Sequence, residues 1–228
     1  MHAEGTKYDP LSDFTWVSAV CTAPMVLIVK PDFPAKTVGE AIELLRSPRS
    51  EGLEYSSSGA GSIPHIGAEL LRHTLGPGNL SRHIPYRGGG PAVLSISKGE
   101  TAWGIASLGS AAGLMQGGLV RPLAVTSPTR FPSFPDVPTF TKSGLKEMEI
   151  NISYLIHAPA GLPDPLLRTL NDAGTAALAT PLARNRFLTA GMQVWEGANT
   201  PGSTRAVVET ELRRFKEIAQ RTGIKISG

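Results

Sequence analysis

The segment from residue 52 to residue 71 places a short strand, a loop of serines and glycines and an amphipathic helix in direct succession. Ile63, Ile66 and Leu70 recur at the spacing of one helix face, which predicts that this helix packs against a sheet. Ser62 stands just before the helix, at the position of an N-cap. Because the loop joins the end of a strand to the start of a helix, the chain is expected to build β-α-β units.

The same unit returns further along the chain, where a strand at 82–86 leads through a glycine turn into a helix at 92–98. Strands and helices alternate in the remaining sequence as well. Further strands are expected at 25–29, 101–106, 121–126, 150–156 and 192–194, and further helices at 38–45, 110–115, 165–178, 182–188 and from 200 onward. This alternation predicts the α/β class, with mostly parallel sheets and flanking helices.

Composition limits the partners that such a fold can take. With 228 residues, of which 41% are hydrophobic and 18% charged, the chain can bury a substantial core. The net charge of +3 is mild and the basic residues form no patch interleaved with aromatics, so no nucleic-acid partner is expected. The single cysteine, Cys21, lies among apolar residues and is expected to be a buried thiol. No apolar run approaches the roughly 18 residues of a membrane span.

The loop at residues 57–62 concentrates groups that bind anions. Three serine hydroxyls and the free amides of a helix N-terminus share a small volume, and the helix dipole adds positive potential there. Each such dipole contact is worth about 0.3–1 kcal/mol, so several must converge on one ligand. The same residues also fit a turn that only caps its own helix, and the loop alone leaves both interpretations open.

Six short motifs occur along the chain in a set order, at residues 8–14, 55–70, 84–88, 123–130, 135–139 and 158–163. Together they resemble the Bug receptors, the extracytoplasmic solute-binding proteins of tripartite tricarboxylate transporters. The match spans nearly the whole chain, and the ordered set is far more specific than any one motif.

The resemblance implies the two-lobed fold of periplasmic binding proteins, type II-like, with the solute held between the lobes. The second lobe, which carries the anion loop, would cover residues 30–153, and the first lobe would consist of residues 1–29 and 154–228. The implied function is capture of a small carboxylate, either a di- or tricarboxylate or an aromatic acid, for the membrane subunits of a transporter. The implied location is the periplasm, and no catalysis, cofactor or metal is expected.

Carried over by this resemblance, the binding residues lie mainly on two strand-to-helix loops. Ser107 stands where the family often has an aspartate, and because a hydroxyl cannot form a salt bridge with an amine, plain carboxylates are favoured over amino acids. Tyr154 stands where the family usually has a tryptophan. The full set of expected binding residues is Ser57, Ser58, Gly59, Gly61, Ser62, Tyr86, Gly88, Gly89, Ser107 and Tyr154.

The sequence departs from the family pattern at its start. The family's chains normally begin with a signal peptide, a first strand and a glycine-rich loop ending in aspartate, and residues 1–13 match none of these. The first lobe is therefore expected to be incomplete, with an exposed sheet edge. An alternative function follows, in which the chain forms a homodimer or another interaction module that no longer binds solute.

Other chemistries have weaker support in the sequence. A serine hydrolase can be drawn with Ser58, His157 and Asp164, but the loop around Ser58 is no nucleophile elbow. The histidines show no metal-ligand spacing and are expected to be surface or capping residues. Arg87, beside three glycines, fits a solvated surface residue better than a carboxylate clamp, and Trp103 fits core packing.

Overall fold

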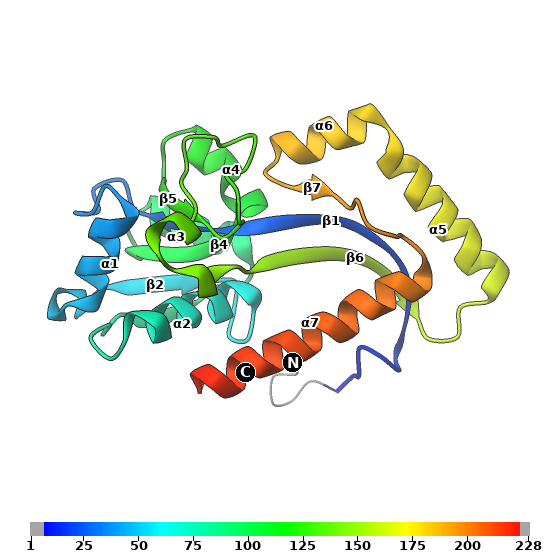
Figure 1. Ribbon diagram of the computed structural model, residues 1–228, viewed down its shortest axis with the longest axis horizontal. Coiled ribbons are helices and arrows are strands. Elements are labelled where there is room, and N and C mark those ends of the chain that lie inside the picture. Colours follow the sequence, from blue (N-terminus) through cyan, green and yellow to red (C-terminus); the bar gives the residue numbers. More distant parts are fainter. Residues whose placement is uncertain (1–6, 224–228) are drawn as a thin grey trace.

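The computed structural model describes residues 7–223, drawn in Figure 1. Its strands are β1 (Phe14–Val29), β2 (Glu54–Ser57), β3 (Arg82–Pro85), β4 (Trp103–Ser107), β5 (Arg121–Val125), β6 (Asn151–Pro159) and β7 (Gln193–Val194). Its α-helices are α1 (Val38–Arg46), α2 (Ile63–Leu75), α3 (Gly89–Ser97), α4 (Leu108–Gln116), α5 (Asp164–Ala179), α6 (Pro181–Thr189) and α7 (Pro201–Thr222). These elements follow the expected order, and the α/β class with flanking helices is confirmed.

Strand β1 connects the two ends of the elongated molecule (Figure 1). Its residues 25–29 pair with β4 on one edge, and residues 26–29 pair with β5 on the other. Its residues 14–24 pair with β6, and Cys21 and Thr22 also pair with β7. The sequence predicted two separate extended pieces here, and the structure joins them into one strand of 16 residues. Residues 25–29, which the sequence placed in the first lobe, lie in the same sheet as β4 and β5.

Strand direction differs from the expectation of mostly parallel sheets. Strands β2, β3 and β4 are parallel to one another, as expected for β-α-β units. Strand β1 is antiparallel to all four of its partners, β4, β5, β6 and β7, so the prediction is wrong for this strand. The reason is that β1 enters the sheet from the opposite end of the molecule, and an apolar run in a sequence carries no information about strand direction.

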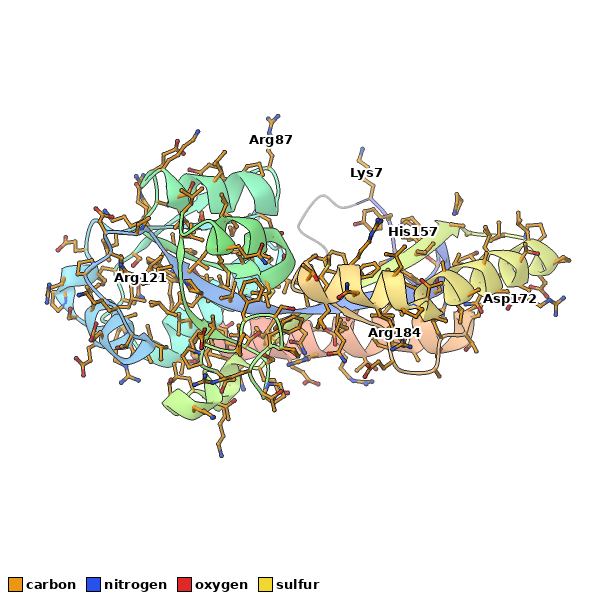
Figure 2. All side chains as sticks on the ribbon, turned by 90° about the horizontal axis from the view of Figure 1, so that it is seen from above. Lys7, Arg87, Arg121, His157, Asp172 and Arg184 are labelled. Atoms are coloured by element: carbon orange, nitrogen blue, oxygen red, sulfur yellow. The ribbon has the colours of Figure 1, made fainter. Side chains whose placement is uncertain are left out.

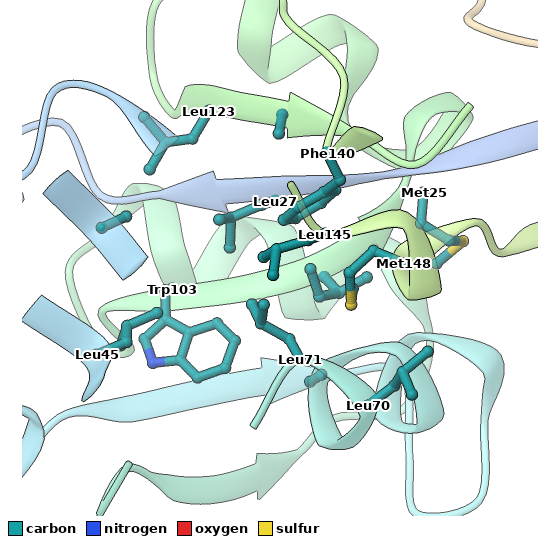
Figure 3. Close-up of a cluster of buried hydrophobic side chains, with 14 of the residues drawn as sticks. Met25, Leu27, Leu45, Leu70, Leu71, Trp103, Leu123, Phe140, Leu145 and Met148 are labelled. Carbon is teal, nitrogen blue, oxygen red and sulfur yellow. The ribbon is translucent and has the colours of Figure 1, made fainter. Parts of the chain in front are cut away.

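Successive side chains of β1 enter two different hydrophobic cores. Met25, Leu27 and Val29 belong to a core that also contains residues of α1, α2 and α7, and Figure 3 shows part of it around Trp103 and Phe140. Val26 and Ile28, on the other face, belong to a second core with residues of α3 and α4. Because side chains alternate between the faces of a strand, this one segment holds helices on both sides of the sheet.

The local signals in the sequence form as expected around these cores. Thr37 and Glu40 have the three-residue spacing of a capping box, and Thr37 caps α1 by accepting a hydrogen bond from the amide of Glu40 at 3.2 Å. Trp103 is fully buried, as predicted, and so is Cys21, which is 1% exposed. Helix α7 runs beneath β1 and β6 towards α2, so that Phe215 joins the first core (Figure 1).

Helices α5 and α6 differ from the rest because none of their residues is fully buried, although Leu188 packs partly against the second core. Leu166, Leu170 and Leu182 on these helices are 47%, 42% and 61% exposed. Helix α5 meets the sheet through Asn171, whose amide donates to the carbonyl of Val17 at 2.8 Å. No helix within residues 7–223 has the length and apolar character needed to cross a bilayer.

The junction of β1, β5 and β6 generates a testable prediction. The buried hydroxyl of Thr126 accepts the amide proton of Met25 at 2.8 Å and donates to the carbonyl of Ile150, so it ties the three strands together. Thr126→Val leaves the Met25 amide unpaired, and we expect it to lower the free energy of unfolding by about 1–3 kcal/mol in urea titrations. The exposed Thr169→Val serves as the control, and an equally small effect at both positions would contradict this account.

Candidate functional site

Three strand-to-helix connections meet at the carboxyl ends of β2, β3 and β4. We call residues 58–62, 86–89 and 107–110 the glycine corner. Ser58 and Gly89 line the same small cavity. A Cβ atom added at Gly89 would lie 2.5 Å from the hydroxyl of Ser110, and one added at Gly59 would lie 3.6 Å from the carbonyl of Tyr86. Because β2, β3 and β4 are parallel, the N-termini of α2, α3 and α4 all begin at this edge of the sheet.

The three helices differ in how their first turns are capped. Ser62 caps α2 by accepting from the amide of His65 at 3.3 Å, and Ser107 caps α4 by accepting from the amide of Ser110 at 3.2 Å. Helix α3 begins after Gly88, which has no side chain and makes no capping hydrogen bond of that kind. The first amides of α3, at Gly89 and Gly90, are therefore donors that an external anion can use.

Several of the expected binding groups are held by the protein itself. The hydroxyl of Ser57 accepts from the amide of Gly59 at 3.2 Å, and the amide of Gly61 donates to Nδ1 of His65 at 3.1 Å. The hydroxyl of Ser62 donates to the carbonyl of Gly59 at 2.7 Å. These bonds give the loop its shape.

Other donors of the loop remain available. Within residues 7–223, the amides of Ser58 and Ala60 have no acceptor on the protein, and neither does the hydroxyl of Ser58. Ser58 is half-buried beside Gly89, and Ala60 is exposed. The corner thus offers backbone donors at the loop and at the start of α3.

Two histidines lie under the loop, where the sequence predicted surface or capping residues. That prediction is wrong for His65, which is 7% exposed and stacks on His83 with ring centroids 4.1 Å apart. His83 in turn stacks on Tyr55, and Tyr55 stacks on Trp103 at 4.8 Å. No spacing in the sequence pairs the two histidines, because they meet only through the parallel register that sets Tyr55 opposite His83.

Burial keeps this stack uncharged at neutral pH. Desolvation, followed by the neighbouring His65, lowers the pKa of His83 to about 4, and desolvation also lowers the pKa of His65. Glu69 opposes both shifts, but it is paired with Arg72 at 2.7 Å. The positive potential at the corner therefore comes from backbone amides and helix dipoles rather than from histidine charge.

The remaining expected binding residues lie less directly at the corner. The phenol of Tyr86 donates to Glu100 at 3.4 Å, so only the backbone of Tyr86 belongs to the corner. The hydroxyl of Ser107 donates to Ser110 at 2.8 Å. Tyr154 pairs with Cys21 in the β1–β6 ladder, away from the ends of β2 and β3. Direct binding by these side chains stays a prediction.

The residues drawn into a hydrolase arrangement are not brought together. No hydrogen bond among residues 7–223 joins Ser58, His157 and Asp164, and His157 packs edge-on against Phe14 at 4.5 Å beside its β1 register partner Trp16. Figure 2 shows Arg87 pointing outward as a surface residue. Nε2 of His83 lies 2.7 Å from the hydroxyl of Ser57 instead. Ser57 is 1% exposed, so no substrate can reach this hydroxyl.

A larger cavity adjoins the loop on the side of α7. Its volume is about 260 Å³, and its walls include Trp16, Gly61, Ile63, Leu155, Glu211 and Phe215. The side chain of Glu211 is 29% exposed, and burial raises the pKa of its carboxyl, although Arg214 opposes this shift. No signal in the sequence singles out Glu211, because a glutamate on an amphipathic helix is most often solvated.

Comparison with known proteins links the chain to one family. The family model described as "Tripartite tricarboxylate transporter family receptor" matches residues 2–224. A UPF0065 protein of Bordetella pertussis is 29% identical over 209 residues, and protein BugT of the same organism is 28% identical over 219 residues. These matches cover 92% and 96% of this chain but 63% and 66% of the relatives, so the chain spans less than two thirds of their lengths.

Solved structures share the fold. Rpa4515 of R. palustris, solved with adipate, superposes with a TM-score of 0.91 at 28% identity, covering 97% of this chain and 73% of that one. The periplasmic binding protein BugD gives a TM-score of 0.91 at 26% identity with the same coverage. MatC of Rhodopseudomonas palustris, with bound malate, gives 0.87 at 26% identity and covers 94% of this chain and 72% of its own.

Acid is expected to destabilise the fold through the histidine stack. An unfolded histidine titrates near pH 6.5, whereas His83 in the folded chain has a pKa of about 4. The unfolded chain binds more protons between these values, so the free energy of unfolding should fall as pH decreases from about 6.5 to about 4, by at most about 1.4 kcal/mol per pH unit for this residue. Urea titrations at several pH values measure this dependence of the free energy of unfolding on pH.

His83→Phe keeps an aromatic ring in the stack and should reduce this pH dependence. His73→Gln is the control, because His73 is exposed and should leave the slope unchanged. A parent slope that persists in His83→Phe would contradict the assignment.

Gly89 and Gly90 form a matched pair for testing how closely the corner is packed. A Cβ at Gly89 would collide with Ser110, whereas a Cβ at Gly90 meets nothing within 4 Å. We expect Gly89→Ala to lower the free energy of unfolding by about 1–3 kcal/mol through overpacking. Gly90→Ala should leave it unchanged or raise it by up to about 1 kcal/mol, as alanine favours a helix. Equal melting temperatures for the two variants would count against close packing here.

Proposed function

Because the chain belongs to the family of tripartite tricarboxylate transporter receptors, we propose that it is a solute receptor that binds a small carboxylate and catalyses no reaction. The observation that carries this proposal is the glycine corner, where the uncapped start of α3 adjoins unpaired amides of the loop after β2. Two of the solved relatives were determined with adipate and malate, which are both carboxylates.

The available donors suit a carboxylate group. Amides of Ser58 and Ala60 on one loop and of Gly89 and Gly90 on the next can share its two oxygen atoms. Each helix-terminus contact is worth about 0.3–1 kcal/mol, so a grip of this kind needs several at once. Such contacts hold the anion without activating it, because the Ser58 hydroxyl has no hydrogen-bonded general base among the described residues and His83 pairs with the buried Ser57 instead. Di- and tricarboxylates and aromatic acids remain the candidate classes.

The solute would be enclosed by movement of two lobes, as in periplasmic binding proteins. The proposed second lobe covers residues 30–153, and the proposed first lobe combines residues 1–29 with 154–228. The long strands β1 and β6 run between these regions and pair over nine positions, so they are the natural hinge. Closure around the carboxylate, in the periplasm, would then be read by the membrane subunits of the transporter.

A second candidate function rests on α5 and α6, which have no fully buried residue. Their exposed leucines could pair with a second copy of the chain, giving a homodimer without solute binding. Light scattering combined with titration calorimetry separates the two candidates. A dimer in light scattering that gives no heat with any carboxylate would favour this alternative.

Titration calorimetry of the folded chain with citrate, malate, adipate, hexanoate and benzoate tests the proposal. We expect at least one of these acids to bind. Ser58→Asp should weaken that binding at least tenfold, because it places a negative charge beside the donors of Gly89. Ser97→Asp, also half-buried but at the far end of α3, should bind as the parent does. Absence of heat from all five acids would refute the proposal.

A further inference from the structure

We propose that the solute carries one carboxylate on an apolar body, with the carboxylate at the glycine corner and the body in the cavity beside α7. This inference rests on the proposed function and assigns its solute to the aliphatic or aromatic monocarboxylates in place of the di- and tricarboxylates. It follows from the size, the lining and the charge of the space that adjoins the loop.

Size comes first. Two of the cavities among the described residues are lined by residues of the 58–62 loop. The one between Ser58 and Gly89 has a volume of about 10 Å³, which holds at most a water molecule, so the carboxylate would lie at its open side against the exposed Ala60 and Gly90. The one beside Gly61 has a volume of about 260 Å³, close to the lower limit of ordinary small-molecule sites. A solute whose carboxylate meets the amide of Ala60 can extend past the adjacent Gly61 into the larger cavity.

The lining of this cavity favours hydrocarbon. Trp16 comes from β1, Leu155 from β6 and Ile63 from the first turn of α2, while Val208 and Phe215 come from α7. Figure 1 shows the reason for this mixture, since α7 passes beneath β1 and β6 and ends near α2. Apart from Glu211, the polar side chain in this lining is Ser153. An aliphatic chain or an aromatic ring placed here would be removed from water on several sides.

Charge excludes a second carboxylate. Glu211 lines the cavity, and among the described residues the cation paired with it is Arg214, whose Nη1 lies 3.9 Å from Oε1 of Glu211. The described lining contains no lysine or arginine side chain. A second carboxylate would therefore lose its hydration water without gaining a cation, and it would be repelled by the charge of Glu211. A hydrocarbon end group has neither the cost of losing hydration water from a charge nor the repulsion from Glu211. Compared with the relatives solved with adipate and malate, this chain should therefore prefer a solute with fewer charges.

Hexanoate and adipate test the inference, because they have the same number of carbons and differ by one carboxylate. In titration calorimetry at pH 7.5 we expect hexanoate to bind the parent chain at least tenfold more tightly than adipate. Glu211→Gln should narrow this difference by strengthening adipate binding. Glu217→Gln is the matched control, because Glu217 lies on the same helix outside this cavity and should leave the ratio unchanged.

Fluorescence locates the ligand independently of the Glu211 variant. Trp16 lines the cavity, so hexanoate should change the tryptophan emission of the parent and leave that of Trp16→Phe unchanged. Adipate binding as tightly as hexanoate in the parent would overturn the inference and leave the receptor function standing. A fluorescence change that persists in Trp16→Phe would likewise overturn the inference and leave the receptor function standing. If none of the acids binds, the receptor function fails and the inference fails with it.

Discussion

The alternation of side chains along β1 is the constraint on which the rest of the structure depends. Met25 and Leu27 fill one core while Val26 and Ile28 fill another, so a single strand fixes helices on both faces of the sheet. The same segment pairs with β4 and β5 on its two edges, and its antiparallel direction places β2, β3 and β4 so that all three end towards the hinge. The glycine corner exists because those three strands end together.

The corner combines a rigid frame with a few unused donors. Hydrogen bonds within the loop hold it in one shape, and they involve the hydroxyls of Ser57 and Ser62 and the ring of His65. The groups in these bonds are not available to a ligand. Because the loop is already held in place, little binding free energy is spent on ordering it when a ligand binds. The donors left over are mostly backbone amides, which fits recognition of an oxyanion rather than chemistry on it.

Local structure could be predicted from the sequence, whereas long-range pairing could not. The caps at Thr37 and Ser62 and the strand-loop-helix order at the corner follow from residue type and spacing, and they form as expected. The direction of β1 and the stacking of His65 on His83 depend on which segments meet, and no local pattern encodes that. Glu211 was missed for the same reason, because its burial arises where α7 crosses beneath β6.

The lone cysteine has a consequence for the chemical durability of the chain. Cys21 lies at the middle of β1, is 1% exposed and contacts the sulfur of Met192 at 3.8 Å. Burial raises the pKa of its thiol to about 11, so almost none of the reactive thiolate is present at neutral pH. In an oxidising compartment this sulfur would neither cross-link two copies of the chain nor react readily with small disulfides, and the protein needs no reductant to stay chemically homogeneous.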